Sequence, residues 1–93
     1  MVKLYNQVNV LTVATRIVHP NSKRTSLVIS NIGDYPVYIG TDNQVSTTNG
    51  FKLPPGNAIS LNKALGDNPD LEYWAVSDGG TGRVAYLEQI KYD

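Results

Sequence analysis

Few side chains in this sequence have the type and spacing that catalysis needs. The single histidine, His19, precedes a proline at the end of a predicted strand, and there is no cysteine and no Gly-x-Ser-x-Gly turn. Glu72 and Glu88 fall in strands that we expect to pair as a hairpin, where two carboxylates could perform glycoside chemistry. A domain this small has little room for the cleft that must also hold a sugar. We therefore predict that the chain is not an enzyme.

Two loops have compositions that ligand sites also use. Asp67, Asn68 and Asp70 offer oxygen ligands for calcium, but they lack the regular spacing and closing glutamate of an EF-hand. Residues 78–82, Asp-Gly-Gly-Thr-Gly, resemble a phosphate-binding loop, but no Gly-Lys-Ser/Thr ending and no helical pattern follow. We interpret both as solvated loops and predict no metal and no cofactor.

Charge gives no reason to expect nucleic acid or membrane as a partner. Eight Lys and Arg balance eight Asp and Glu, so the formal net charge is zero. The basic pair Lys23 and Arg24 has no aromatic residues interleaved with it, and we expect both side chains to be solvated. The N-terminus turns polar too early for a signal peptide, and no apolar run approaches the roughly 20 residues of a membrane span.

The elements that would position these residues are strands. β-branched and aromatic residues are spread along the chain, and turn residues recur about every ten positions. This pattern predicts an all-β fold, a compact antiparallel β-sandwich of seven to eight strands, with an immunoglobulin-like or a jelly-roll strand order. The predicted extended segments are 7–18, 25–32, 35–40, 51–53, 58–61, 71–77 and 83–91, with one helical turn at 63–65.

Turn signals suggest how some strands are connected. We expect Gly33-Asp34 to join a hairpin between 25–32 and 35–40, and the loop 78–82 to join a second hairpin. The alternation of apolar residues changes phase near Val10, which indicates a β-bulge or a strand that passes from one sheet to the other. The last strand is apolar on both faces, so it should be central in its sheet or covered by another chain.

Aromatic residues are the best candidates for contact with a partner. Six Tyr, one Trp and one Phe exceed what a core of this size requires. Tyr73 and Trp74 are adjacent in one strand, so one should be a core residue and the other should face outward. Tyr35 and Tyr38 are weaker candidates for an outward-facing contact by the same reasoning.

Several motifs resemble those of one protein family. Residues 23–33 read Lys-Arg-Thr-Ser-Leu-Val-Ile-Ser-Asn-Ile-Gly, and residues 37–40 read Val-Tyr-Ile-Gly. These runs, together with 47–50, 53–56 and 74–82, resemble small β-sandwich virion proteins of tailed phages and related prokaryotic viruses, over a match that spans Arg24 to Glu88. The resemblance implies a virion structural protein: a capsid decoration, head-fibre, spike-base or minor capsid protein that stabilises the shell. It also implies a major capsid or other virion protein as partner, a homo-oligomer such as a trimer, and location in the virion after synthesis in the host cytoplasm.

The segment 1–18 lies outside this match, and we predict that it is an N-terminal arm or first strand that docks on a partner, while 19–93 form the body of a single domain. The predicted interface residues are Val2, Leu4, Tyr5, Val8, Tyr35, Tyr38, Tyr73 and Trp74.

Two alternative functions remain open at the level of sequence. One is a carbohydrate- or receptor-binding module of a viral fibre or spike, with its site on the loops 41–50 and 62–70. The other is an immunoglobulin-like adhesion or chaperone domain, whose unpaired edge strand would accept a partner's strand.

Overall fold

Residues 4–91 fold into eight strands and one short helical turn. The computed structural model describes residues 4–91. The strands are β1 (Tyr5–Val10), β2 (Thr15–Val18), β3 (Arg24–Asn31), β4 (Val37–Gly40), β5 (Phe51–Leu53), β6 (Ala58–Asn62), β7 (Tyr73–Ser77) and β8 (Gly82–Ile90), and the 3-10 turn η1 (Lys63–Leu65) follows β6. No helix within residues 4–91 has the length and apolarity that crossing a membrane requires.

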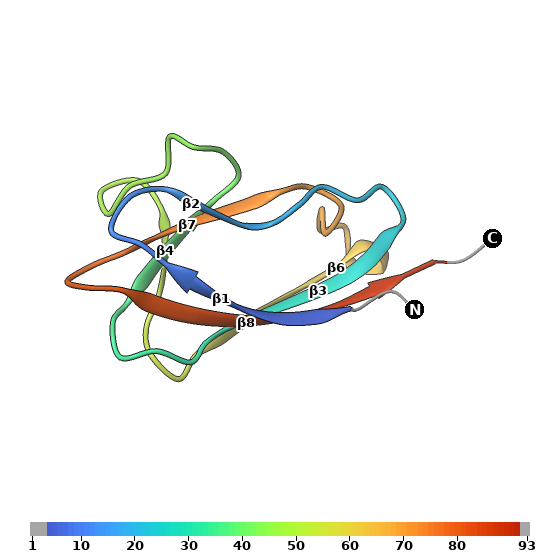
Figure 1. Cartoon of the computed structure of the whole chain (residues 1–93). Helices are drawn as coiled ribbons and strands as arrows, with labels where there is room; N and C mark the ends of the chain where they lie inside the picture. Colours follow the sequence, from blue (N-terminus) through green and yellow to red (C-terminus); the bar gives the residue numbers. More distant parts are fainter. Residues whose placement is uncertain (1–3, 92–93) are drawn as a thin grey trace.

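Two four-stranded antiparallel sheets form the layers of a β-sandwich, as the sequence predicts (Figure 1). Sheet A has the order β1-β8-β3-β6, and sheet B has the order β2-β7-β4-β5. The last strand, β8, is central between β1 and β3, which confirms the expectation from its two apolar faces. The helical turn at 63–65 is also present, closed by Gly66 with a positive φ of 91°.

The strand order is that of a jelly roll. Four antiparallel pairs are nested within one another: β4 with β5, β3 with β6, β2 with β7, and β1 with β8. The chain therefore behaves as one long hairpin that has been rolled into two sheets, and the pairs β3–β8 and β4–β7 close the roll. This order decides between the two arrangements that the sequence leaves open.

The two hairpins predicted at residues 33–34 and 78–82 are wrong. β3 lies in sheet A and β4 in sheet B, and β7 and β8 are likewise in different sheets. Each of these turns carries the chain from one layer to the other. Turn residues mark where the chain reverses, but they do not determine whether the next strand pairs with the previous one or packs across the core from it.

The phase change near Val10 marks a change of sheet. β1 ends at Val10 in sheet A, and β2 begins at Thr15 in sheet B. Val10, Ile17 and Val18 are all buried in the main core. From Leu4 onward, the segment predicted as an N-terminal arm is therefore part of the sandwich.

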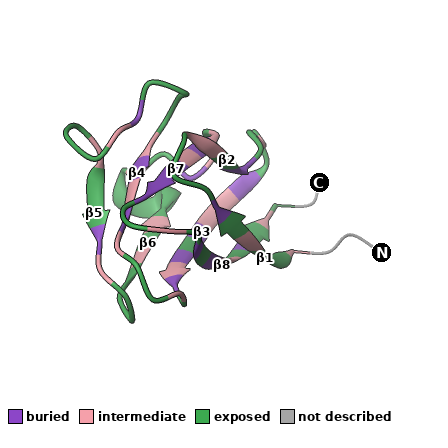
Figure 2. Cartoon of the chain, turned by 60° about the vertical axis from the view of Figure 1, so that its left-hand side comes forward, coloured by how far each residue is buried: buried purple, intermediate pink, exposed green. Residues whose placement is uncertain are grey.

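The core lies between the sheets and follows the period-2 alternation of each strand. Leu27 and Ile29 on β3 are fully buried, whereas Val28 between them is exposed. Val37 on β4 and Val84 on β8 are also fully buried. Figure 2 shows the alternation of buried and less buried residues along β3. The packed face of each sheet is thus apolar, and the opposite face is left for solvent or a partner.

Asn31 fastens one end of the sandwich from inside. Its side chain is fully buried, and Nδ2 donates to the carbonyl oxygens of Tyr35 and Leu53, both at 2.8 Å. Its Oδ1 accepts from the backbone N–H of Gly33 at 3.0 Å. One amide thereby connects β3 to the crossover into β4 and to β5, so its hydrogen bonds join the two sheets.

Arg24 fastens the opposite end, although the sequence predicts a solvated side chain. Only 3% of Arg24 is exposed, and its guanidinium donates to Glu88 Oε2 at 2.8 Å. Nη1 also donates to the carbonyl oxygens of Pro69 and Leu71, and Nη2 donates to that of His19. The prediction failed because these acceptors come from distant segments that the sequence around Arg24 does not reveal.

Candidate docking surface

The predicted interface residues of the N-terminal segment have different environments. Tyr5 is 62% exposed, Leu4 is half-buried, and Val8 is partly buried against the core. Val8 therefore contributes to the interior of the sandwich. Val2 lies outside the described residues.

The predicted aromatic residues divide between core and surface. Tyr73 is a core residue with 8% exposure, and its neighbour Trp74 is half-buried on the outer face of sheet B, which confirms the expected division. Tyr38 is half-buried on the same outer face. Tyr35 is 39% exposed in the crossover between β3 and β4, with its ring against Gly79 and Gly80.

Tyr73 holds its loop through its hydroxyl group. The Tyr73 O–H donates to the carbonyl oxygen of Asn68 at 2.7 Å. Burial raises the pKa of the phenol, and the carboxylate of Asp70 raises this pKa further. The role of Tyr73 that the structure supports is thus to anchor the loop before β7.

An apolar row crosses the outer face of sheet A. The register places Tyr5 on β1 opposite Leu87 on β8, Leu87 opposite Val28 on β3, and Val28 opposite Ser60 on β6. Leu87 is 49% exposed and Val28 is 36% exposed. Cross-strand neighbours on one face lie about 4.5–5.5 Å apart, so these side chains form a continuous strip.

The rest of this face consists mainly of small or polar residues. The next row consists of Gln7, Ala85, Ser30 and Ala58. Among the outward-facing positions of these four strands, only Arg83 is charged. We call the face the sheet A surface; it comprises Tyr5, Gln7, Asn9, Ser26, Val28, Ser30, Ala58, Ser60, Asn62, Arg83, Ala85, Leu87 and Gln89.

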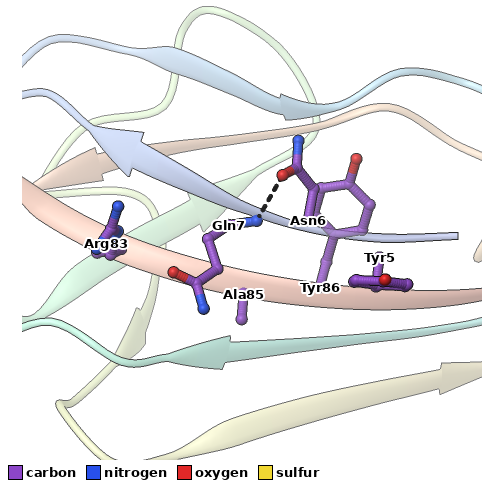
Figure 3. A pocket seen from close by; sticks show the side chains of 6 residues that line it. All are labelled: Tyr5, Asn6, Gln7, Arg83, Ala85 and Tyr86. Carbon is purple, nitrogen blue, oxygen red and sulfur yellow. Dashed lines mark hydrogen bonds between the residues drawn. The ribbon is translucent and has the colours of Figure 1, made fainter. Parts of the chain in front are cut away.

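A shallow depression of about 430 Å³ lies along β1 and β8 of this surface (Figure 3). Tyr5, Gln7, Arg83 and the small residue Ala85 line it from the sheet A surface. Asn6 and Tyr86 also line it, but their side chains point to the opposite side of the strands. The side chain of Asn6 accepts a hydrogen bond from the backbone N–H of Gln7 at 2.9 Å. The sheet A surface therefore offers a partner an aromatic ring, an amide and a guanidinium group around a low centre.

The outer face of sheet B differs because the chain itself covers part of it. The loop 41–50 folds back so that Val45 packs on Gly40, and a methyl group at Gly40 would lie only 2.8 Å from Val45. Val45 is consequently buried at 8% exposure. Farther along the same face, Glu72 accepts from Trp74 Nε1 at 2.7 Å and lies 3.9 Å from the guanidinium of Arg16.

The candidate catalytic and metal residues are not assembled into a site. Glu72 lies outside sheet B and Glu88 inside the sandwich with Arg24, so the two glutamates are not neighbours across a hairpin. His19 is exposed. Asp67 Oδ2 accepts from the backbone N–H of Asn62 and so closes its own loop. Among residues 4–91, no group of three or more His, Cys, Asp or Glu side chains is placed to hold a metal ion.

The loops 41–50 and 62–70, proposed as a sugar site, contain no aromatic residue. Trp74 is half-buried and held by Glu72 rather than displayed at either loop. Sugar binding needs an exposed aromatic ring beside polar groups, so the structure offers little support for a sugar site on these two loops.

Comparison of the chain with protein-family models, with curated proteins and with solved structures finds no match. The candidate surface is thus defined by geometry alone. Sequence reasoning included Tyr5 but missed Val28 and Leu87. The alternation in β3 and β8 gives each of these residues a face, but only the pairing of β1 with β8 and β8 with β3 places the three side chains in one row.

Proposed function

We propose that this chain is a structural component of a virus particle, a decoration or minor capsid protein that stabilises the shell by protein–protein contacts. The observation that carries the proposal is the row Tyr5–Leu87–Val28 on an otherwise small and nearly uncharged sheet A surface. Exposed apolar side chains that lie together on a surface of low charge are typical of protein interaction sites.

Three further features support this role. The jelly-roll order occurs widely in capsid domains, although it also occurs in lectins and cupins and does not decide function alone. The motifs between Arg24 and Glu88 resemble small virion proteins. A partner that binds only the folded state also stabilises the fold, which suits a domain of 93 residues with a small core.

Incorporation into particles tests the proposal. The wild-type chain and the variants Leu87→Glu and Val13→Glu are produced, with an epitope tag, in cells that make the particles, and the chain is quantified in particles purified by density gradient. Val13 is the matched control because it is 64% exposed in the connection between β1 and β2, away from the sheet A surface. Thermal unfolding of each purified variant establishes that it is folded.

We expect wild type and Val13→Glu to enter the particles and Leu87→Glu to be reduced at least about tenfold, because a charge in a buried apolar contact leaves an unpaired ion. Absence of the wild-type chain from all particle fractions would overturn the virion role. Equal incorporation of the two variants would overturn the sheet A surface as the contact.

Association of copies with one another is a separate part of the proposal. Light scattering over a concentration series is expected to give the mass of a closed oligomer, with a trimer as the expected state. A monomer at every concentration would contradict self-association and leave the contact with the shell as the only one proposed.

A further inference from the structure

Three lysines from distant parts of the sequence meet at one end of sheet A. Lys23 precedes β3, Lys63 follows β6, and Lys91 follows β8. The backbone N–H of Lys91 donates to the carbonyl oxygen of Lys23 at 2.7 Å. We call the depression that they share the lysine pocket; its volume is about 430 Å³, and it is lined by Ser22, Lys23, Thr25, Lys63 and Lys91.

The positive charge of the lysine pocket has no partner within the described part of the chain. The two ion pairs of residues 4–91 are Arg16–Glu72 and Arg24–Glu88, and neither involves a lysine. No carboxylate of residues 4–91 lines the pocket, and all three lysines are exposed. Three like charges around one depression attract anions, and the hydroxyls of Ser22 and Thr25 can donate hydrogen bonds to the same group.

We propose that the lysine pocket binds carboxylate groups of an acidic segment on the protein that covers the sheet A surface. The pocket continues this surface, because its lysines flank the ends of β3, β6 and β8. The inference rests on the proposed function in one respect, that the carboxylates belong to the covering protein. Electrostatic complementarity at such a margin fixes the orientation of the partner and accelerates the encounter.

Charge also distinguishes this partner from a second copy of the chain. The sheet A surface carries Arg83 toward one end and the lysine pocket at the other, and no described acidic side chain faces outward on it. Two copies placed face to face would bring positive groups toward positive groups, which costs binding energy. A different protein with carboxylates opposite the lysine pocket avoids this repulsion.

A nucleic acid fits the lysine pocket less well. Within residues 4–91 no aromatic residue lines the pocket, so bases would find no ring there on which to stack. The formal net charge of the chain is zero, so no broad positive field attracts a phosphate backbone. The charge is confined to a site with room for a few carboxylates.

Fluorescence anisotropy with a labelled peptide of ten glutamates tests the inference on the purified full chain. The variant Lys23→Gln/Lys91→Gln removes two charges from the pocket, and the matched control Arg16→Gln/Lys52→Gln removes two charges from the outer face of sheet B. At low salt we expect the wild type and the control to bind within about twofold of each other and the pocket variant to bind about tenfold more weakly, since an exposed ion pair contributes up to about 1 kcal/mol.

Three results would overturn the inference: no binding of the peptide at low salt, equal weakening in both variants, or tighter binding of an oligothymidylate of equal charge that the pocket variant abolishes. The last result would assign the pocket to nucleic acid. Failure here is distinguishable from failure of the proposed function. Peptide binding by a chain that is absent from particles would sustain the pocket alone, whereas incorporation without peptide binding would sustain the virion role alone.

Discussion

Arg24 and Glu88 form an ion pair inside the sandwich, with Nε of the arginine 2.8 Å from Oε2 of the glutamate. The two residues come from neighbouring strands of sheet A, and both side chains are largely hidden from solvent. The arginine also holds three carbonyl oxygens of the connecting loops. This pair is therefore the point at which sheet A fastens the loops that lead into β3 and β7.

Removal of one partner from this pair should be costly. We expect Glu88→Ala to lower the free energy of unfolding by about 3–5 kcal/mol, because it leaves the guanidinium buried without its counter-charge. The control is Arg16→Ala, which breaks the exposed pair with Glu72, 3.9 Å away, keeps the hydrogen bond from Trp74 to Glu72, and should cost less than about 1 kcal/mol. Urea denaturation followed by circular dichroism measures both. Similar costs would show that the buried pair contributes no more than the exposed one.

Removal of the Asn31 amide should destabilise the fold almost as much as breaking the Arg24–Glu88 ion pair. Asn31→Ala removes three buried or partly buried hydrogen bonds, two to carbonyl oxygens and one from an N–H group. We expect a loss of about 2–4 kcal/mol in the free energy of unfolding. The control Asn57→Ala changes an exposed side chain of the same type and should be nearly neutral. A neutral Asn31→Ala would mean that water replaces the amide.

Substitution of Ser77 should keep or increase the stability of the fold rather than lower it. Its Oγ is buried and has no hydrogen-bond partner among residues 4–91. Ser77→Ala removes an unsatisfied polar atom, so the melting temperature should stay the same or rise, in line with a gain of up to about 1 kcal/mol. Differential scanning calorimetry measures the change. A loss of stability would reveal a partner for the hydroxyl group, such as a bound water molecule.

The raised pKa of Tyr73 should make the stability of the fold depend on pH in alkaline solution. The pKa of its phenol is raised in the folded state, so the folded and unfolded chains both hold the proton below about pH 10, and the unfolded chain loses it first as pH rises. Stability should therefore fall from about pH 10 upward through the raised pKa. Tyr73→Phe should be about 1 kcal/mol less stable at pH 8, because its hydrogen bond to Asn68 is lost, but should decline less steeply above pH 10.

Urea denaturation at pH 8, 10 and 11 compares the two slopes. Other groups that titrate in this range are common to both proteins, so the difference between them isolates Tyr73. Identical slopes would show that the phenol titrates alike in the folded and unfolded chains.

Local patterns predicted much of the fold. The two apolar faces of β8 indicated its central position, the phase change near Val10 marked the passage between sheets, and Gly66 closes the predicted helical turn. The pairing of strands was not predictable in this way, since a reversal looks the same whether the next strand pairs or crosses the core. The two expected hairpins failed for this reason.

The candidate surfaces depend on the same long-range information. Arg24 and Glu88 are 64 residues apart in the sequence, and nothing near Arg24 distinguishes it from its solvated neighbour Lys23. The three lysines of the lysine pocket are likewise separated by long stretches of chain, and only the ends of three adjacent strands bring them together. Composition identified aromatic residues as contact candidates, but it could not place Leu87 beside Tyr5.

The nested pairing of the jelly roll has a consequence for biosynthesis. Because β8 is central in sheet A, β1 has no neighbouring strand in that sheet until residues 82–90 have emerged from the ribosome. The innermost pair, β4 with β5, can form early, but the outermost pairs must wait and then join segments far apart in sequence. The nascent chain therefore carries an open, apolar half-sandwich until residues 82–90 have emerged, and during this interval it should be most susceptible to aggregation and most dependent on chaperones.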